Sequence, residues 1–128
     1  MLTKRIIKPV PAFTIRQDFM QRVENVIVKN LDNEDFCMAD LQADLYMSSS
    51  QIYRKIKKET GYSPSVFTRN IRLQYACEYI LRSDLSLSEI AYKVGFNGLS
   101  YFSKCFSRRY GLSPSSFRVQ KIHFYQQL

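Results

Sequence analysis

The cationic side chains of this chain are unevenly distributed, and they are the residues best suited to binding an anion. The sequence has 19 Lys and Arg against 11 Asp and Glu, which gives a formal net charge of +8. No basic residue occurs between Lys29 and Arg54, and no acidic residue follows Glu89. Positive charge therefore gathers at 54–58 and 104–121, which favours an anionic partner such as a nucleic acid.

Other site chemistry finds little support in the sequence. Cys37, Cys77 and Cys105 are widely spaced, and His123 is the single histidine, so no tetrahedral metal set can be assembled. There is no nucleophile signature and no phosphate-cradling glycine loop. We expect three reduced cysteines that act as small hydrophobic residues, no metal, no cofactor and no enzymatic activity.

The apolar segments are too short for a membrane protein. None approaches the roughly 18 residues that span a bilayer, and the apolar run within MLTKRIIKPVP is too short for a signal peptide. We therefore expect a soluble, cytoplasmic protein without membrane contact.

Two similar stretches lie 50 positions apart: KKETGYSPSVF at 57–67 and SRRYGLSPSSF at 107–117. In each, a glycine is positioned to end a helix in the left-handed conformation, at Gly61 and Gly111. A Ser-Pro pair then starts the next helix, because serine caps free amides and proline tolerates the first helical position. The repeat predicts that one joint between two helices is built twice.

The hydrophobic spacing predicts helices and no strand. The first should begin after an N-cap at Asp18, and a stripe of Phe67, Ile71, Tyr75 and Tyr79 indicates a long central helix. Ser86 and Glu89 form a capping box before a short helix. The predicted helices are one from Asp18, 38–45, Ser49 to Thr60, 64–82, a short one that holds Ile90, Ala91 and Val94 and stops at Gly95, Ser100 to Tyr110, and a last one from Pro114.

Each half of the chain thus has a short helix, a tight turn and a second helix with a basic outer face. That outline is typical of a helix-turn-helix, whose second helix fits the major groove of DNA. A plain helical bundle with two basic solvated faces is the alternative on periodicity and charge alone.

Over residues 19–119 the chain resembles the DNA-binding domain of AraC/XylS-type transcription regulators. The second unit, SEIAYKVGFNGLSYFSKCFSRRYGLSPSSFR at 88–118, is similar to the family signature, and MSSSQIYRKIKKETGYSPSVFTRNIR at 47–72 matches in the first unit. The segment SDLSLSEIAYKVGF is also similar to the output domains of hybrid two-component regulators. In the first unit the sequence departs from the pattern, with Gln42 at the usual small residue and Tyr46 at the usual turn glycine.

The resemblance implies an all-α fold of about seven helices, with two helix-turn-helix subdomains joined by a long linker helix. The predicted division is a linker or tail at 1–16, a first unit at 17–62, the linker helix at 63–83, and a second unit with its packing helix at 84–128. Phe67 and Phe117 should lie buried at the two joints.

The resemblance also places base contacts on the exposed N-terminal half of each recognition helix. The base-contact candidates are Ser50, Tyr53, Arg54, Leu99, Ser100, Tyr101 and Lys104. Arg54 is the strongest, because a guanidinium can meet guanine O6 and N7 together. The phosphate-contact candidates are Lys55, Lys57, Lys58, Arg108 and Arg109.

We therefore expect a sequence-specific regulator that binds double-stranded DNA, or the output domain of a larger one. RNA polymerase and a sensor or dimerisation domain of a longer parent chain are expected partners. The alternative is a helical protein-interaction module that binds through the acidic 32–44 segment. RNA binding ranks last, because no stacking sheet or G-x-x-G motif is present.

Overall fold

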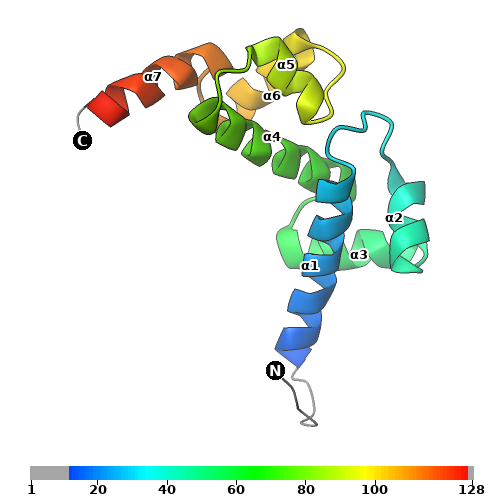
Figure 1. The fold of residues 1–128 in the computed structure, drawn as a ribbon. Coiled ribbons are helices and arrows are strands. Elements are labelled where there is room, and N and C mark those ends of the chain that lie inside the picture. The colour runs from blue at the N-terminus through cyan, green and yellow to red at the C-terminus, as the bar shows by residue number, and fades with distance from the viewer. Residues whose placement is uncertain (1–11, 127–128) are drawn as a thin grey trace, which may run out of the picture.

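The computed structural model describes residues 12–126, with side chains described from 18 to 120. Within that range all regular elements are helices, arranged as two groups joined by one long helix (Figure 1). The helices are α1 (Ala12–Lys29), α2 (Met38–Leu45), α3 (Ser49–Thr60), α4 (Pro64–Arg82), α5 (Leu87–Lys93), α6 (Leu99–Tyr110) and α7 (Pro114–Gln126). The predicted all-α class with seven helices is confirmed.

The first helix is longer than the sequence suggested. It begins at Ala12, so the prediction that Asp18 caps it was wrong, and residues 12–16 of the predicted linker are helical. The sequence AFTIR contains no glycine or proline that would stop a helix, and Pro11 before it is compatible with a helix start. Residues 1–11 lie outside the described residues.

Two separate hydrophobic cores hold the two groups of helices. The first core is built by α1, α2, α3 and one residue of α4, and consists of Phe19, Val23, Val26, Ile27, Leu41, Leu45, Ile52, Ile56 and Ile71. The second is built by α4, α5 and α6 with the turn between the last two, and consists of Leu73, Ala76, Ile80, Ile90, Ala91, Val94, Phe96, Phe102, Cys105 and Phe106. The first core thus supports the short helix α2 and the longer α3, and the second supports the short helix α5 and the longer α6.

The linker helix α4 contributes to both cores. Ile71 is buried in the first core, while Leu73, Ala76 and Ile80 are buried in the second. The predicted stripe was therefore wrong at Tyr75, which is exposed. A single stripe at steps of four describes a helix with one buried face, whereas α4 turns different faces to two cores.

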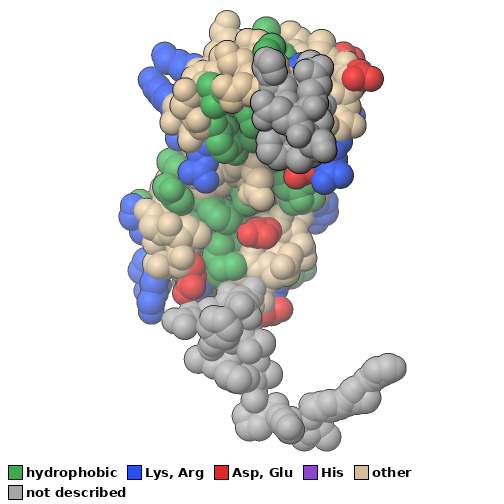
Figure 2. Space-filling view, turned by 90° about the vertical axis from the view of Figure 1, so that its left-hand side faces the viewer, with side chains coloured by type: hydrophobic (Ala, Val, Ile, Leu, Met, Phe, Trp, Pro, Cys, Tyr) green, Lys and Arg blue, Asp and Glu red, His purple; other side chains and the backbone are tan. Residues whose placement is uncertain are grey.

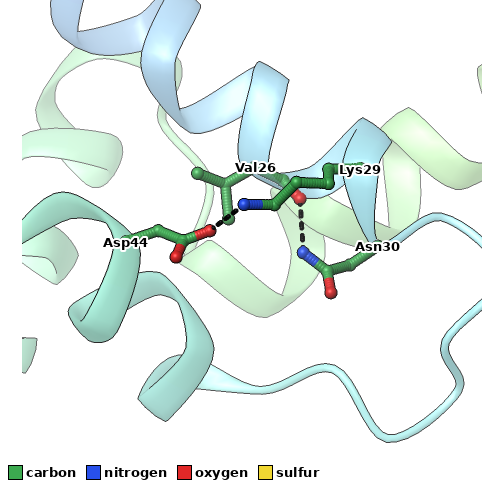
Figure 3. Close-up of polar contacts among 4 residues, drawn as sticks. All are labelled: Val26, Lys29, Asn30 and Asp44. Atoms are coloured by element: carbon green, nitrogen blue, oxygen red, sulfur yellow. Dashed lines mark hydrogen bonds and ion pairs between the residues drawn. The ribbon is translucent and has the colours of Figure 1, made fainter.

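An ion pair joins α1 to α2 at the edge of the first core, beside a hydrogen bond from Asn30 back to α1 (Figure 3). Lys29 Nζ lies 2.6 Å from Asp44 Oδ2, and Asn30 Nδ2 donates to the carbonyl of Val26 at 2.8 Å. The Lys29 side chain is 66% exposed, so this ion pair contributes at most about 1 kcal/mol. The buried apolar contacts hold α2 against α1.

The two joints have the predicted construction. Ser63 accepts from the amide of Val66, Ser113 accepts from that of Ser116, and Pro64 and Pro114 are buried. Phe67 packs on the first core and Phe117 on the second, but each is only partly buried. The prediction that both lie buried is therefore only partly right, because each aromatic ring lies at the edge of its core.

Candidate nucleic-acid interface

In the first unit, a short turn sets the direction of α3. Tyr46 ends α2 in the left-handed conformation at φ 55°, and its amide donates to the carbonyl of Gln42 at 2.9 Å. Ser48 then caps α3, and it exchanges hydrogen bonds with Gln51 in a capping box. Ile52 and Ile56 are fully buried. These contacts fix which face of α3 points outward.

The outward face of α3 carries the predicted base-contact candidates. Ser50, Tyr53 and Arg54 are exposed, and so are Lys57 and Lys58. Positions 50, 53, 54 and 57 share one side of a helix, because residues three and four apart are neighbours. This side of α3 therefore presents one hydroxyl, one aromatic ring and two cationic side chains to a binding partner.

Lys55 differs from the other lysines of α3. Its ammonium lies 5.1 Å from the centre of the Phe19 ring on α1, which is within the range of a cation–π contact. Lys55 therefore lies on the flank of α3 nearest α1.

In the second unit, α5 and its turn present α6 in the same manner. Ser86 and Glu89 form the predicted capping box at the start of α5, with distances of 3.0 and 3.1 Å. Gly95 follows α5 at φ 89°, and Gly98 precedes α6. Phe102 and Phe106 are fully buried. These two rings form the inward face of α6.

The outward face of α6 carries Leu99, Ser100, Tyr101 and Lys104, all of which are exposed. The Tyr101 ring lies 5.9 Å from that of Phe96, centre to centre, and is 51% exposed. Tyr101 is therefore held by the second core on one side while half of its surface remains accessible.

Cations gather where the two units meet. A surface groove of about 230 Å³ is lined by Arg69 and Asn70 of α4 and by Arg108 and Arg109 of α6. Figure 2 shows Lys and Arg side chains at both margins of one face of the molecule, and those along the left margin lie over both of its halves. This arrangement suits a polyanion that extends past both units.

The cysteines differ in their surroundings. Burial raises the pKa of Cys77, and Tyr110 has its pKa raised to about 12 by burial together with a hydrogen bond to Cys77. Cys105 is buried in the second core, whereas Cys37 is exposed. The prediction that all three cysteines act as small hydrophobic residues was therefore wrong for Cys37. Among the described residues no cluster of His, Cys, Asp or Glu could hold a metal ion.

One buried polar residue was missed by the sequence analysis. Arg72 of α4 is 7% exposed and donates to three backbone carbonyls, those of Leu31, Asn33 and Val94. An arginine between the buried Ile71 and Leu73 was the available signal, because a charged residue inside an apolar run must find partners.

The sequence matches the model of a known family. A model described as a helix-turn-helix domain matches residues 41–120, more than half of the chain. The chain belongs to the AraC-type helix-turn-helix family. Part of the described chain, from 41 to 120, therefore has the two-unit architecture of AraC-type DNA-binding domains.

Curated relatives of the chain are longer proteins. The chain is 30% identical over 105 residues to histidine kinase P4 of Formosa agariphila, covering 82% of the chain and 8% of the kinase. It is also 30% identical over 119 residues to the transcriptional activator NphR of a Rhodococcus species, covering 93% of the chain and 35% of the activator. The chain spans about a third or less of these curated relatives.

A solved structure shows the same AraC-type fold. The DNA-binding domain of AdpA, a global transcriptional factor crystallised in complex with a target DNA, is 25% identical and has a TM-score of 0.73. The match covers 84% of this chain and 98% of that one. Among the described residues of the present chain, no helix is long and apolar enough to cross a membrane.

Proposed function

We propose that this chain is the DNA-binding output domain of a longer transcription regulator. It reads duplex DNA with two recognition helices, α3 and α6, placed in adjacent major-groove segments. The observation that carries the proposal is the pair of exposed helix faces, each held outward by a buried apolar stripe and each basic. The AraC-type family and the DNA complex of AdpA support it over a protein-interaction module.

In this proposal the outward residues divide into two groups. Arg54 makes a bidentate contact to guanine and Lys104 a less directional contact to a base. Ser50, Tyr53, Leu99, Ser100 and Tyr101 complete the base-reading surfaces. Lys57, Lys58, Arg108 and Arg109 bind phosphates, with Lys55 in a lesser role, and supply affinity more than sequence choice.

One molecule then reads one asymmetric site on one face of the duplex. Segments one helical turn apart lie roughly 34 Å from centre to centre on straight B-DNA, so the DNA bends where the two helices lie closer than that. The two units have different outward residues, so the two half-sites differ in sequence.

The proposed role implies a cellular location and a set of partners for the domain. It acts in the cytoplasm, where bacterial DNA lies, without catalysis and without membrane contact. A sensor or dimerisation domain of the parent chain controls it, and RNA polymerase is its partner at the promoter. The resemblance to histidine kinase P4 favours a two-component parent.

Selection of bound duplexes from a random pool, followed by footprinting and salt titration, tests the proposal. We expect a single site protected over two adjacent major-groove segments on one face, with affinity that falls steeply as salt rises. Protection of about half a turn would overturn the two-helix arrangement. Equal affinity for all duplexes, or no binding to duplex DNA, would overturn sequence-specific binding.

A further inference from the structure

We propose that Arg72 is a positioning residue that fixes how far apart the two recognition helices lie, and thereby selects the spacing between the two half-sites. The inference rests on the proposed function of α3 and α6. Arg72 lies on the linker helix, and its guanidinium bonds the backbone of both units.

The contacts of Arg72 join segments that are far apart in sequence. Nη1 donates to the carbonyl of Leu31 at 2.6 Å and to that of Val94 at 2.9 Å, while Nη2 donates to the carbonyl of Asn33 at 3.0 Å. Leu31 and Asn33 follow the end of α1, and Val94 follows the end of α5. One side chain thus holds the end of a first-unit helix against the end of a second-unit helix.

The charge of Arg72 suits this place. Both segments follow helix C-termini, where unpaired carbonyls carry partial negative charge. Burial lowers the pKa of Arg72 and the nearby carboxylate of Asp32 opposes that effect. A guanidinium presents its donors in a rigid planar fork, so the three carbonyls are held in a fixed relation to one another.

Gly95 makes room for this contact. A Cβ built on Gly95 would lie 1.3 Å from Nη1 of Arg72 and 2.5 Å from the carbonyl oxygen of Leu31, and the glycine has φ 89°. Any side chain at 95 would therefore displace the guanidinium. Arg72 and Gly95 are a matched pair, one supplying the donors and the other the space.

The contact reaches both recognition helices through short connections. Val94 and Gly95 lead into the turn before α6, where Phe96 packs on Phe102 of that helix at 5.3 Å between ring centres. On the other side, α1 packs with α3 in the first core. The side chain of Leu31 also packs on the second core. Movement at Arg72 thus changes the placement of α6 relative to α3.

The test uses the selected site and two derivatives of it. One derivative has a single base pair inserted between the half-sites, and the other keeps only one half-site. Wild type, R72M and R72K are titrated on all three duplexes, with R82M as the matched control, since Arg82 is an exposed arginine on the same helix.

Wild type and R82M should bind the duplex with native spacing about tenfold or more tightly than the duplex with the inserted base pair. Two linked binding sites gain affinity only when the spacing lets both bind at once. R72M should lose most of that preference and keep its affinity for the single half-site. R72K, which keeps the charge without the fork, should fall between them. G95A, which retains Arg72 but displaces it, should behave like R72M.

The outcomes separate the two proposals. A spacing preference in R72M and G95A equal to that of wild type would overturn the role of Arg72 while leaving DNA binding intact. If R72M and G95A lost the same amount of affinity for all three duplexes, including the single half-site, the role of Arg72 would also be overturned. Such a uniform loss of affinity is the result expected from general unfolding. Failure of wild type to bind any duplex would instead overturn the proposed function.

Discussion

Gly61 and Gly111, 50 positions apart, have nearly the same left-handed backbone conformation, with φ angles of 80° and 81°. The amide of each donates to a carbonyl four residues earlier at 2.8 Å, that of Lys57 in one case and of Ser107 in the other. A Cβ added at either glycine would meet no heavy atom within 4 Å. Both glycines are thus required by conformation alone, and packing plays no part.

Gly111→Ala should lower the free energy of unfolding by about 1–2 kcal/mol, the cost of placing a Cβ in the left-handed region. Gly111→Asn should lower it less, because asparagine tolerates this conformation. Urea titration measures both. Gly98 is a matched control, since its φ is 178° and its Cβ would meet nothing within 4 Å. A loss in Gly98→Ala as large as in Gly111→Ala would contradict the conformational explanation.

Tyr46→Gly should raise the free energy of unfolding by up to about 1 kcal/mol. Tyr46 has φ 55° without being glycine, and its side chain is 91% exposed, so little packing is lost. Relief of left-handed strain is partly offset by the greater freedom of glycine in the unfolded chain. Thermal and urea unfolding check the direction, and a destabilised variant would show that the Tyr46 ring makes stabilising contacts.

Arg54→Ala should weaken binding to the selected DNA site by about 1–3 kcal/mol and relax the base preference at one position. Lys57→Ala should weaken binding to all sequences alike and reduce the salt slope by about one. Titrations on the selected site and on single-base variants separate the two effects. An unchanged affinity and preference in Arg54→Ala would show that the alignment of the first unit is wrong.

Phe117→Ala should lower the free energy of unfolding by about 2–3 kcal/mol, less than the 3–5 kcal/mol of a fully buried phenylalanine, because the ring is only partly buried. The ring lies 5.6 Å from that of Phe106 on α6, so DNA affinity should fall although Phe117 is not a candidate contact. Val119→Ala is the control, since Val119 is 59% exposed. Equal stabilities of the two variants would contradict a bracing role.

Glu89 should make the free energy of unfolding depend on pH in the acidic range. Hydrogen bonds from the backbone and hydroxyl of Ser86 lower the pKa of Glu89. The folded pKa lies below the unfolded one, so the stabilisation is present above the unfolded value and is lost as pH falls through the folded value. Wild type should therefore exceed Glu89→Gln in unfolding free energy at neutral pH, and urea titrations should show this excess shrinking below about pH 4.3. A difference that does not change with pH would contradict it.

The helix ends could be predicted from sequence where a residue type dictates a backbone conformation. The bounds of α3 and the start of α4 follow from Ser48, Gly61 and the Ser63-Pro64 pair, because each favours a cap for a local reason. The start of α1 was missed because Asp18 is an acceptable cap that is simply not used. Choosing between possible caps depends on tertiary packing, which a local pattern does not contain.

The candidate site shows the same limit. The outward placement of Arg54 and Lys104 follows from helical period, and both are exposed as expected. The assignment of these residues to bases stays a prediction. Arg72 could not be assigned, because its partners are carbonyls that lie 22 to 41 positions away. Backbone acceptors have no residue type, so no motif reports them.

The burial of Ile71 in one core and of Leu73 in the other has a consequence for motion. The two residues lie about 200° apart around the axis of α4. The two units therefore pack against nearly opposite sides of the helix. Rolling α4 about its own axis would withdraw both side chains at once, and each core would open. Rotation of α4 about its own axis is therefore opposed by both cores at once, and the contacts of Arg72 restrain the segments beside it that follow α1 and α5.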